Sequence, residues 1–140
     1  MDTQAGYFGS TQLHIAVSRG REKTAVLLLR AGASPNMRDE SGDSALHLVC
    51  GPSGRSDLVE LLLGHGASIN VQNRDGNTPL IIALQRGNGL ARRLLELPEI
   101  ETHHTNNKGD NALVAACSRG DLNILYILLR FRLGELGRLF

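Results

Sequence analysis

The sequence predicts an all-α protein, a solenoid of stacked helix–turn–helix units. Two observations lead to this prediction. A pattern of glycine, leucine and alanine recurs every 33 or 34 residues, and each copy holds two short apolar stretches. A unit of this size cannot bury an apolar face alone, so neighbouring units must stack to create the core. Aromatic residues make up only 4% of the chain, which indicates an aliphatic core.

The repeat is visible in four aligned segments, GSTQLHIAVSRG, GDSALHLVCGPSG, GNTPLIIALQRG and GDNALVAACSRG. Their opening glycines are 33, 34 and 33 residues apart, and the closing glycines place the extra residue within CGPSG of the second segment. We therefore expect a single domain over residues 1–140. Its four units cover approximately 6–38, 39–72, 73–105 and 106–133, and a C-terminal tail covers 134–140.

The first helix of each unit follows a short polar residue that can accept a hydrogen bond from an exposed N–H of the first turn. These capping residues are Thr11, Ser44, Thr78 and Asn111. The second residue of each helix is a leucine that we expect to face the core, and these are Leu13, Leu46, Leu80 and Leu113. A glycine then ends the helix and lets the chain reverse.

The second helix of each unit is predicted from the apolar stretches TAVLLL, DLVELLL, ARRLLE and NILYILL. In the first two units, Gly32 and Gly66 suit the left-handed turn that ends a helix. In the third unit, Pro98 ends the helix instead, and Gly89 weakens its beginning. We expect this third-unit helix to be the least stable of the set.

The fourth unit has no closing glycine, and its second apolar stretch continues through residues 129–133. The end of a solenoid needs a polar outer side. This segment is instead rich in apolar residues, namely Tyr126, Phe131, Leu133, Leu136, Leu139 and Phe140. Either the last helix folds back as a cap, or a further domain or subunit covers the apolar surface. We favour capping by the tail and expect a monomer, unless this surface associates.

The segment DGNTPL at residues 75–80 is close to the opening D-x-x-G-x-T-P-L-H-x-A of ankyrin repeats, and QLHIA at 12–16 and ALH at 45–47 supply the L-H element. Over about residues 6–133 the chain therefore resembles the ankyrin-repeat family. The resemblance implies that the histidines of the L-H elements connect neighbouring turns through hydrogen bonds. It also implies short β-turn fingers between the units, formed by the residues that flank each opening glycine. The fingers and the residues before each closing glycine line a concave face, where family members commonly bind partners.

Three of the four units place an arginine directly before the closing glycine, and the second unit has GPSG followed by Arg55. Carried over from the family, the partner-binding residues are Tyr7, Phe8, Arg19, Glu40, Asp43, Arg74, Asp75, Arg86, Lys108, Asp110 and Arg119. A guanidinium group suits carboxylates and phosphates, and an exposed aromatic pair suits an anchor.

Each of these features has a second interpretation. The arginines either contact a partner or merely cover the groove with their long side chains. Tyr7 and Phe8 either anchor a partner or cap the core of the first unit. The GPSGR insertion is either a specificity element or a tolerated irregularity in an exposed loop.

Several classes of function find no support in the sequence. The net charge of +1 and the absence of a basic stripe argue against nucleic-acid binding. The longest apolar stretch, 124–129, is too short to span a membrane. The glycines lie at unit boundaries rather than in phosphate loops, and no catalytic set fits the repeat. We therefore expect no enzyme activity and no cofactor.

Two groups of residues with reactive or ligating side chains remain. Cys50 and Cys117 occupy the same position of two units, and we expect both to be small buried residues in a reducing compartment, the cytoplasm or nucleus. His103 and His104 are adjacent in ETHHTNNKG. We expect a solvated loop there and no metal site, because no neighbouring carboxylate or thiol is expected to complete one.

The sequence thus favours a non-enzymatic module that binds a protein or peptide partner, for example one with acidic segments, on its concave face. An inhibitor or adaptor of a folded regulatory protein is the preferred role. The alternative is a structural or targeting segment of a larger protein, packed through its apolar C-terminal end.

Overall fold

The computed structural model describes residues 11–51, 54–87 and 89–137, with side chains described as far as residue 130. These residues form eight helices and no strand. The helices are α1 (Gln12–Ser18), α2 (Glu22–Arg30), α3 (Ala45–Val49), α4 (Ser56–Gly64), α5 (Pro79–Arg86), α6 (Leu90–Leu95), α7 (Ala112–Arg119) and α8 (Leu122–Gly137). They pair into four helical hairpins, as the repeat predicts.

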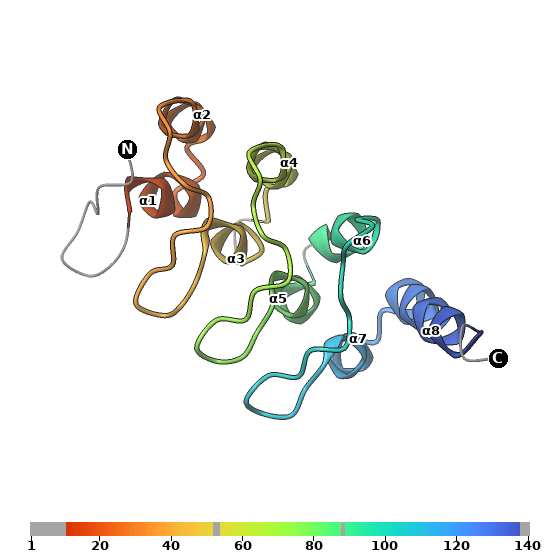
Figure 1. The fold of residues 1–140 in the computed structure, drawn as a ribbon. Coiled ribbons are helices and arrows are strands. Elements are labelled where there is room, and N and C mark those ends of the chain that lie inside the picture. The colour runs from red at the N-terminus through yellow and green to blue at the C-terminus, as the bar shows by residue number, and fades with distance from the viewer. Residues whose placement is uncertain (1–10, 52–53, 88, 138–140) are drawn as a thin grey trace.

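The hairpins stack side by side in chain order (Figure 1). Helices α1, α3, α5 and α7 form an inner row in which each helix packs on the next, and α2, α4, α6 and α8 form an outer row. Loops project from the inner row on the side away from the outer row. We call residues 39–43, 73–77 and 106–110 the finger loops. The predicted all-α solenoid is confirmed.

The inner helices begin at the predicted capping residues. Thr11, Thr78 and Asn111 each accept a side-chain hydrogen bond from the N–H three residues further on, at 3.2, 3.2 and 3.0 Å. Ser44 caps α3 together with His47, because its hydroxyl and its N–H lie 2.9 and 3.1 Å from Nδ1 of that ring. The local polar pattern therefore locates these helix starts correctly.

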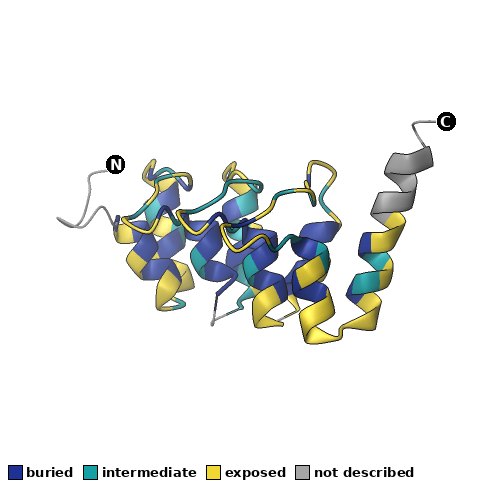
Figure 2. Ribbon diagram, turned by 90° about the horizontal axis from the view of Figure 1, so that it is seen from below, coloured by how far each residue is buried: buried dark blue, intermediate teal, exposed yellow. Residues whose placement is uncertain are grey.

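The core lies between the two rows and is aliphatic. Leu13, Leu46 and Leu80 are each at most 1% exposed. Leu113, which was expected to be buried in the same way, is only partly buried. No further hairpin stacks on α7 within the part of the chain described, so one side of this leucine remains open. Figure 2 shows buried residues along the middle of the stack and exposed residues at its edges and on the C-terminal helix.

The two cysteines differ in burial although they occupy the same position of two units. Cys50 is fully buried, and burial raises the pKa of its thiol to about 12. Cys117 is exposed. The expected buried role is therefore confirmed for Cys50 and wrong for Cys117, which lies on the same uncovered side of the stack as Leu113.

The outer helix of the third hairpin is the shortest of its row. Helix α6 has six residues, begins after Gly89 with φ of 86°, and ends at Leu95 before Pro98. Arg93 ties it to α4 through a two-pronged ion pair with Glu60, at 2.5 and 2.9 Å. That this helix is the least stable of the set stays a prediction.

Helix α8 continues as one helix to Gly137. The favoured fold-back of the tail is therefore wrong as far as residue 137, and residues 138–140 lie outside the described part. The side chains of Leu122, Tyr126 and Leu129 are 76%, 66% and 47% exposed. Their spacing of four and three residues places them on one face of the helix. None of the helices described is both long and apolar enough to cross a membrane.

Two buried histidines connect neighbouring hairpins. Nε2 of His14 lies 2.9 Å from the carbonyl oxygen of Asp43, and Nε2 of His47 lies 2.8 Å from that of Val71. In each ring Nδ1 accepts the N–H of the cap residue, so Nε2 carries the proton and donates to the carbonyl. The predicted tether is thus confirmed, and Ile81 occupies the equivalent position in the third unit.

Burial lowers the pKa of His47 below its ordinary value of 6.5. The nearby charge of Asp43 and the two carbonyl contacts act in the opposite direction but do not outweigh burial. The folded state therefore prefers the neutral ring. Stability that depends on His47 is complete above pH 6.5 and decreases as the pH falls towards the lowered pKa, because the unfolded chain binds the proton first.

Truncating equivalent leucines should reveal the open end of the stack. Leu46→Ala should lower the free energy of unfolding by about 2–5 kcal/mol, because it leaves a cavity in the fully buried core. Leu113→Ala should cost clearly less, because this side chain is already partly in water. Urea unfolding followed by circular dichroism measures both. Equal losses would contradict the burial difference.

Replacing His47 should change both stability and its pH dependence. His47→Gln should lower the free energy of unfolding by about 1–3 kcal/mol at pH 7.5, because the Val71 carbonyl loses its donor. The decline in stability below pH 6.5 should also become shallower than in the wild type. His65→Gln, at an exposed position after α4, is the matched control. An unchanged slope in the His47 variant would show that the ring does not titrate with folding.

Candidate partner-binding surface

Each finger loop is organised by one side chain that accepts two backbone N–H groups. Asp39 Oδ1 accepts hydrogen bonds from the N–H groups of Ser41 and Asp43, both at 2.9 Å. Asn73 and Asn106 repeat the arrangement in the next two finger loops, at 2.9–3.0 Å. This turn, closed by a side chain, gives the three finger loops the same backbone shape.

Successive finger loops are hydrogen-bonded to one another. The N–H of Arg74 donates to the carbonyl of Ser41 at 3.0 Å, and the N–H of Asn107 donates to that of Asp75 at 2.9 Å. The contact needs a glycine, because a Cβ on Gly76 would lie 2.8 Å from the backbone of the next finger loop. The finger loops therefore form one linked edge rather than three independent loops.

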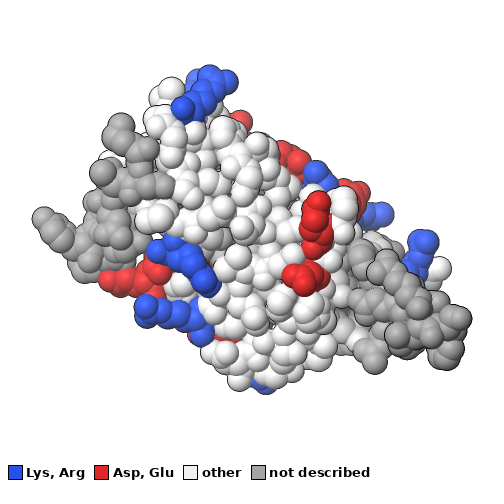
Figure 3. All heavy atoms as spheres, in the orientation of Figure 1, with Lys and Arg blue, Asp and Glu red and all other residues white. Residues whose placement is uncertain are grey.

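The predicted finger residues that are exposed on this edge are Glu40, Arg74, Asp75 and Lys108. Asp43 is half-buried and accepts a hydrogen bond from Asn73 Nδ2 at 2.8 Å, so its carboxylate already serves the link between two finger loops. Asp110 is half-buried as well. Tyr7 and Phe8 lie outside the described residues. Figure 3 shows acidic and basic side chains side by side over the finger loops.

The arginines before the closing glycines are exposed. Arg86 and Arg119 stand in the last turns of α5 and α7, which pack against each other. Arg19 follows α1 and borders a shallow hollow with Ile15 and Leu28. Among the residues described, none of these three arginines forms an ion pair, in contrast to Arg93 on α6. Their charge is therefore available to another molecule.

Arg119 lies against the glycine that ends the preceding inner helix. Gly87 has φ of 63°, and a Cβ built there would collide with the Arg119 guanidinium group. The absence of a side chain on Gly87 thus leaves room for the arginine of the next unit. This close approach between units was not predicted, since nothing local in either unit indicates it.

The second unit interrupts the row of unpaired arginines, because its arginine, Arg55, is already bound to other residues of the chain. Arg55 Nη1 donates to the carbonyl of Gly20 at 2.7 Å, and the guanidinium also binds Asp57 at 2.7 and 3.2 Å. This pairing holds the pKa of Asp57 at about 2. The neighbouring carboxylate of Asp57 raises the pKa of Glu22 above its ordinary value. Arg55 therefore fastens the first two hairpins together.

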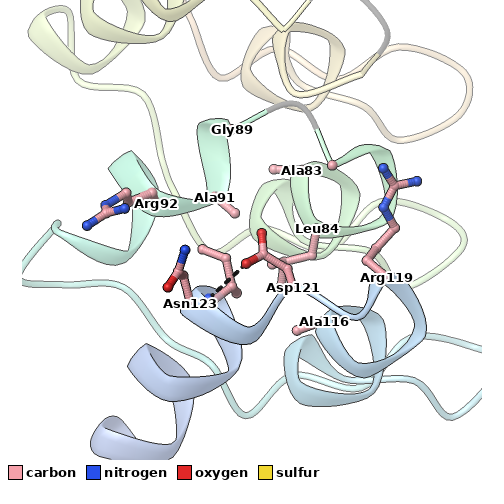
Figure 4. A pocket seen from close by; sticks show the side chains of 11 residues that line it. Ala83, Leu84, Gly89, Ala91, Arg92, Ala116, Arg119, Asp121 and Asn123 are labelled. Carbon is pink, nitrogen blue, oxygen red and sulfur yellow. Dashed lines mark hydrogen bonds between the residues drawn. The ribbon is translucent and has the colours of Figure 1, made fainter.

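A cleft of about 240 Å³ opens beside Arg119, between the third and fourth hairpins (Figure 4). Its apolar lining comes from Ala83, Leu84, Ala91, Ala116 and Ile124. Arg119 and Arg92 lie on opposite sides, with Asp121 between them. The Asp121 carboxylate accepts the N–H of Ile124 at 3.2 Å and so caps α8. Sequence reasoning missed this cleft, because its lining comes from four helices of two different units.

The histidine pair also differs from expectation. Glu101 Oε1 lies 3.5 Å from His104 Nε2, and Glu101 Oε2 lies 4.0 Å from His103 Nε2. The expectation that no carboxylate accompanies the two histidines is therefore wrong. The spacing E-x-H-H was a visible signal, but only the loop conformation brings the three side chains together.

Comparison with known proteins agrees with the fold. Residues 13–102 and again 46–135 match the family described as Ankyrin repeats (3 copies). Ankyrin repeat domain-containing protein 63 of Mus musculus is 36% identical over 80% of this chain and 30% of its own length. The same protein of Homo sapiens is 35% identical over 80% of this chain and 31% of its own length. Rabankyrin-5 of Mus musculus is 31% identical over 86% of this chain and 10% of its own length.

The chain thus spans less than a third of the length of these relatives. The family match covers well over half of the chain and agrees with the stacked hairpins, the histidine tethers and the linked finger loops. Ankyrin repeats are typically non-enzymatic and generally mediate interactions between proteins. This chain belongs to the ankyrin-repeat family.

Proposed function

We propose that the chain is a regulatory inhibitor or adaptor whose inner-row surface binds an acidic segment of a protein partner. The observation that supports this most is the pair Arg86 and Arg119. Both are exposed at equivalent positions of adjacent units, and neither is paired within the part of the chain described. Guanidinium groups bind carboxylates with two parallel hydrogen bonds, so two such groups in register suit an acidic peptide.

The cleft beside Arg119 adds a second kind of contact. Its aliphatic lining and its volume of about 240 Å³ suit a single aliphatic side chain of the partner. Arg92 and Arg119 on its rim favour acidic residues on either side of that aliphatic one. The preferred partner is therefore an acidic segment with an aliphatic anchor, rather than a nucleic acid or a membrane surface.

The linked finger loops give the surface rigidity. The backbone hydrogen bonds between finger loops and the shared side-chain turns hold Glu40, Arg74 and Lys108 at defined positions. A surface that is ordered before binding loses little entropy on association. The proposed location is the cytoplasm or nucleus, in keeping with two free thiols, Cys50 and Cys117, that form no disulfide.

A second candidate function is supported by α8. Leu122, Tyr126 and Leu129 form an exposed apolar face at the end of the stack. Such a face suits packing against another domain or subunit, as in a structural or targeting segment of a larger protein.

Charge reversal on the inner row should separate the proposed surface from the rest of the molecule. Peptides selected from a displayed random library against the wild type should be rich in Asp and Glu. The double variant Arg86→Glu/Arg119→Glu should bind them roughly tenfold or more weakly, because two attractions become repulsions. Fluorescence anisotropy at low and high salt measures the change.

The matched control for this experiment is Lys23→Glu/Arg30→Glu on the exposed side of α2, which makes the same change in net charge on the outer row. It should leave the affinity almost unchanged. Equal weakening in both double variants, or none in either, would refute the inner-row surface as the binding site.

Light scattering distinguishes the second candidate function. Self-association through α8 should raise the apparent mass with concentration. The variant Leu122→Glu/Tyr126→Lys should then remain monomeric, since it replaces the apolar face with a favourable i, i+4 ion pair. A wild type that stays monomeric at high concentration counts against packing through α8 and leaves the inner-row proposal intact.

A further inference from the structure

The connection that follows α6 carries three side chains with metal-ligating atoms. Glu101, His103 and His104 each offer one ligand atom, and these atoms all lie within 4.8 Å of one another. The two rings are stacked with centroids 4.4 Å apart. Among the described residues, this is the group of carboxylate, imidazole and thiol side chains that comes close enough to hold an ion.

One of the three ligand atoms is buried without a partner. His104 Nε2 is inaccessible to solvent and has no hydrogen bond within the described structure. Its nearest carboxylate oxygen, on Glu101, lies 3.5 Å away and outside hydrogen-bond geometry. Leaving a buried polar atom without a partner costs free energy, so native proteins seldom do it without a reason. An ion bound between His104 and Glu101 would supply the missing partner.

The repeat register shows that these residues depart from the pattern. Glu101, His103 and His104 stand where the second unit has Ser68, Asn70 and Val71, and where the first unit has Ser34, Asn36 and Met37. An imidazole therefore replaces an apolar side chain at one position. The burial of an unsatisfied nitrogen is specific to the third unit.

The second substitution places His103 where the second and first units have Asn70 and Asn36, and these two asparagines hold the turn of the next unit in place. Asn70 clamps the segment that follows, because Nδ2 donates to the Glu99 carbonyl and Oδ1 accepts the Glu101 N–H, both at 2.9 Å. Asn36 clamps residues 66–68 in the same way, at 3.2 and 2.7 Å. In the fourth unit α8 continues to Gly137, so the equivalent turn is absent. His103 therefore has no segment to clamp and is free for another role.

The backbone that carries the three ligands is anchored at both ends. The Asn70 clamp fixes residues 99–101, and Gln72 Nε2 donates to the Thr105 carbonyl at 3.1 Å. The fixed backbone restricts the search for a binding geometry to side-chain rotations. Figure 3 also shows acidic side chains over this connection, and their negative charge favours a cation.

We propose that Glu101, His103 and His104 form a binding site for Zn²⁺, with water completing a four-coordinate shell. Two imidazoles and one carboxylate are a donor set that zinc prefers. In a tetrahedral zinc site the ligand atoms lie about 3.4 Å apart. The 3.5 Å pair of Glu101 and His104 already has this spacing. The His103 ring, 67% exposed, turns out of the stack to complete it.

A bound ion would fasten the connection between the third and fourth hairpins. This connection follows the shortest outer helix, and Ile81 provides no histidine tether here. Zinc binding to the folded state would therefore raise the stability of the chain by mass action. The site lies on the connection between α6 and α7, so it is independent of the partner surface formed by Arg86 and Arg119.

The test is titration of the tag-free chain with zinc chloride in an isothermal calorimeter. The chain carries Cys117→Ala to remove the exposed thiol, while Cys50 stays buried. One equivalent of zinc should bind with micromolar affinity, and the thermal midpoint should rise in its presence. His103→Asn and His104→Val, which introduce the residues found in the second unit, should abolish binding at the same concentrations. Glu101→Gln should weaken it.

His65→Asn is the control, because His65 is exposed and lies outside the cluster. It should bind zinc like the parent chain. The far-ultraviolet circular dichroism of every variant should match the parent, since Asn and Val already occupy the equivalent positions of the second unit and Glu101 is exposed. Absence of zinc binding in the parent chain would overturn the proposal, and so would equal binding after His103→Asn and His104→Val.

Discussion

Contact between the apolar faces of neighbouring hairpins is the interaction on which the rest of the structure depends. Helices of five to nine residues, such as α3 and α4, do not persist alone in water. They form here because neighbouring hairpins cover their apolar faces. The histidine tethers, the Arg55 cluster and the finger-loop hydrogen bonds join the same neighbours. Apolar and polar contacts therefore reinforce each other at every junction.

Much of the fold could be predicted because its signals are local. Thr11, Thr78 and Asn111 mark helix starts by chemistry that acts within one turn. The exceptions, Leu113 and Cys117, have the same local sequence role as buried residues elsewhere. Their exposure depends on their place in the stack, which no single unit encodes. The course of α8 to Gly137 is a similar case, since a fold-back requires a surface to fold onto.

The candidate surfaces were predictable in position but not in the contacts of each side chain. The row of arginines follows from the repeat. The structure shows in addition that Arg55 is hydrogen-bonded to Gly20 and Asp57, whereas Arg119 lies against Gly87. Glu101 lies beside the histidine pair because Asn70, a residue of the preceding unit, accepts a hydrogen bond from the Glu101 N–H and fixes the conformation of the loop. Such contacts between units arise from the stacking geometry, so they become visible only in three dimensions.

The shortest inner helix, α3, and the shortest outer helix, α6, belong to adjacent hairpins. The seam between these hairpins is therefore flanked by the two shortest helices of the stack, and polar links such as Glu60 to Arg93 span it. Short helices bury little apolar surface between neighbours, so each polar link contributes a larger share of the contact at this seam than at the other junctions.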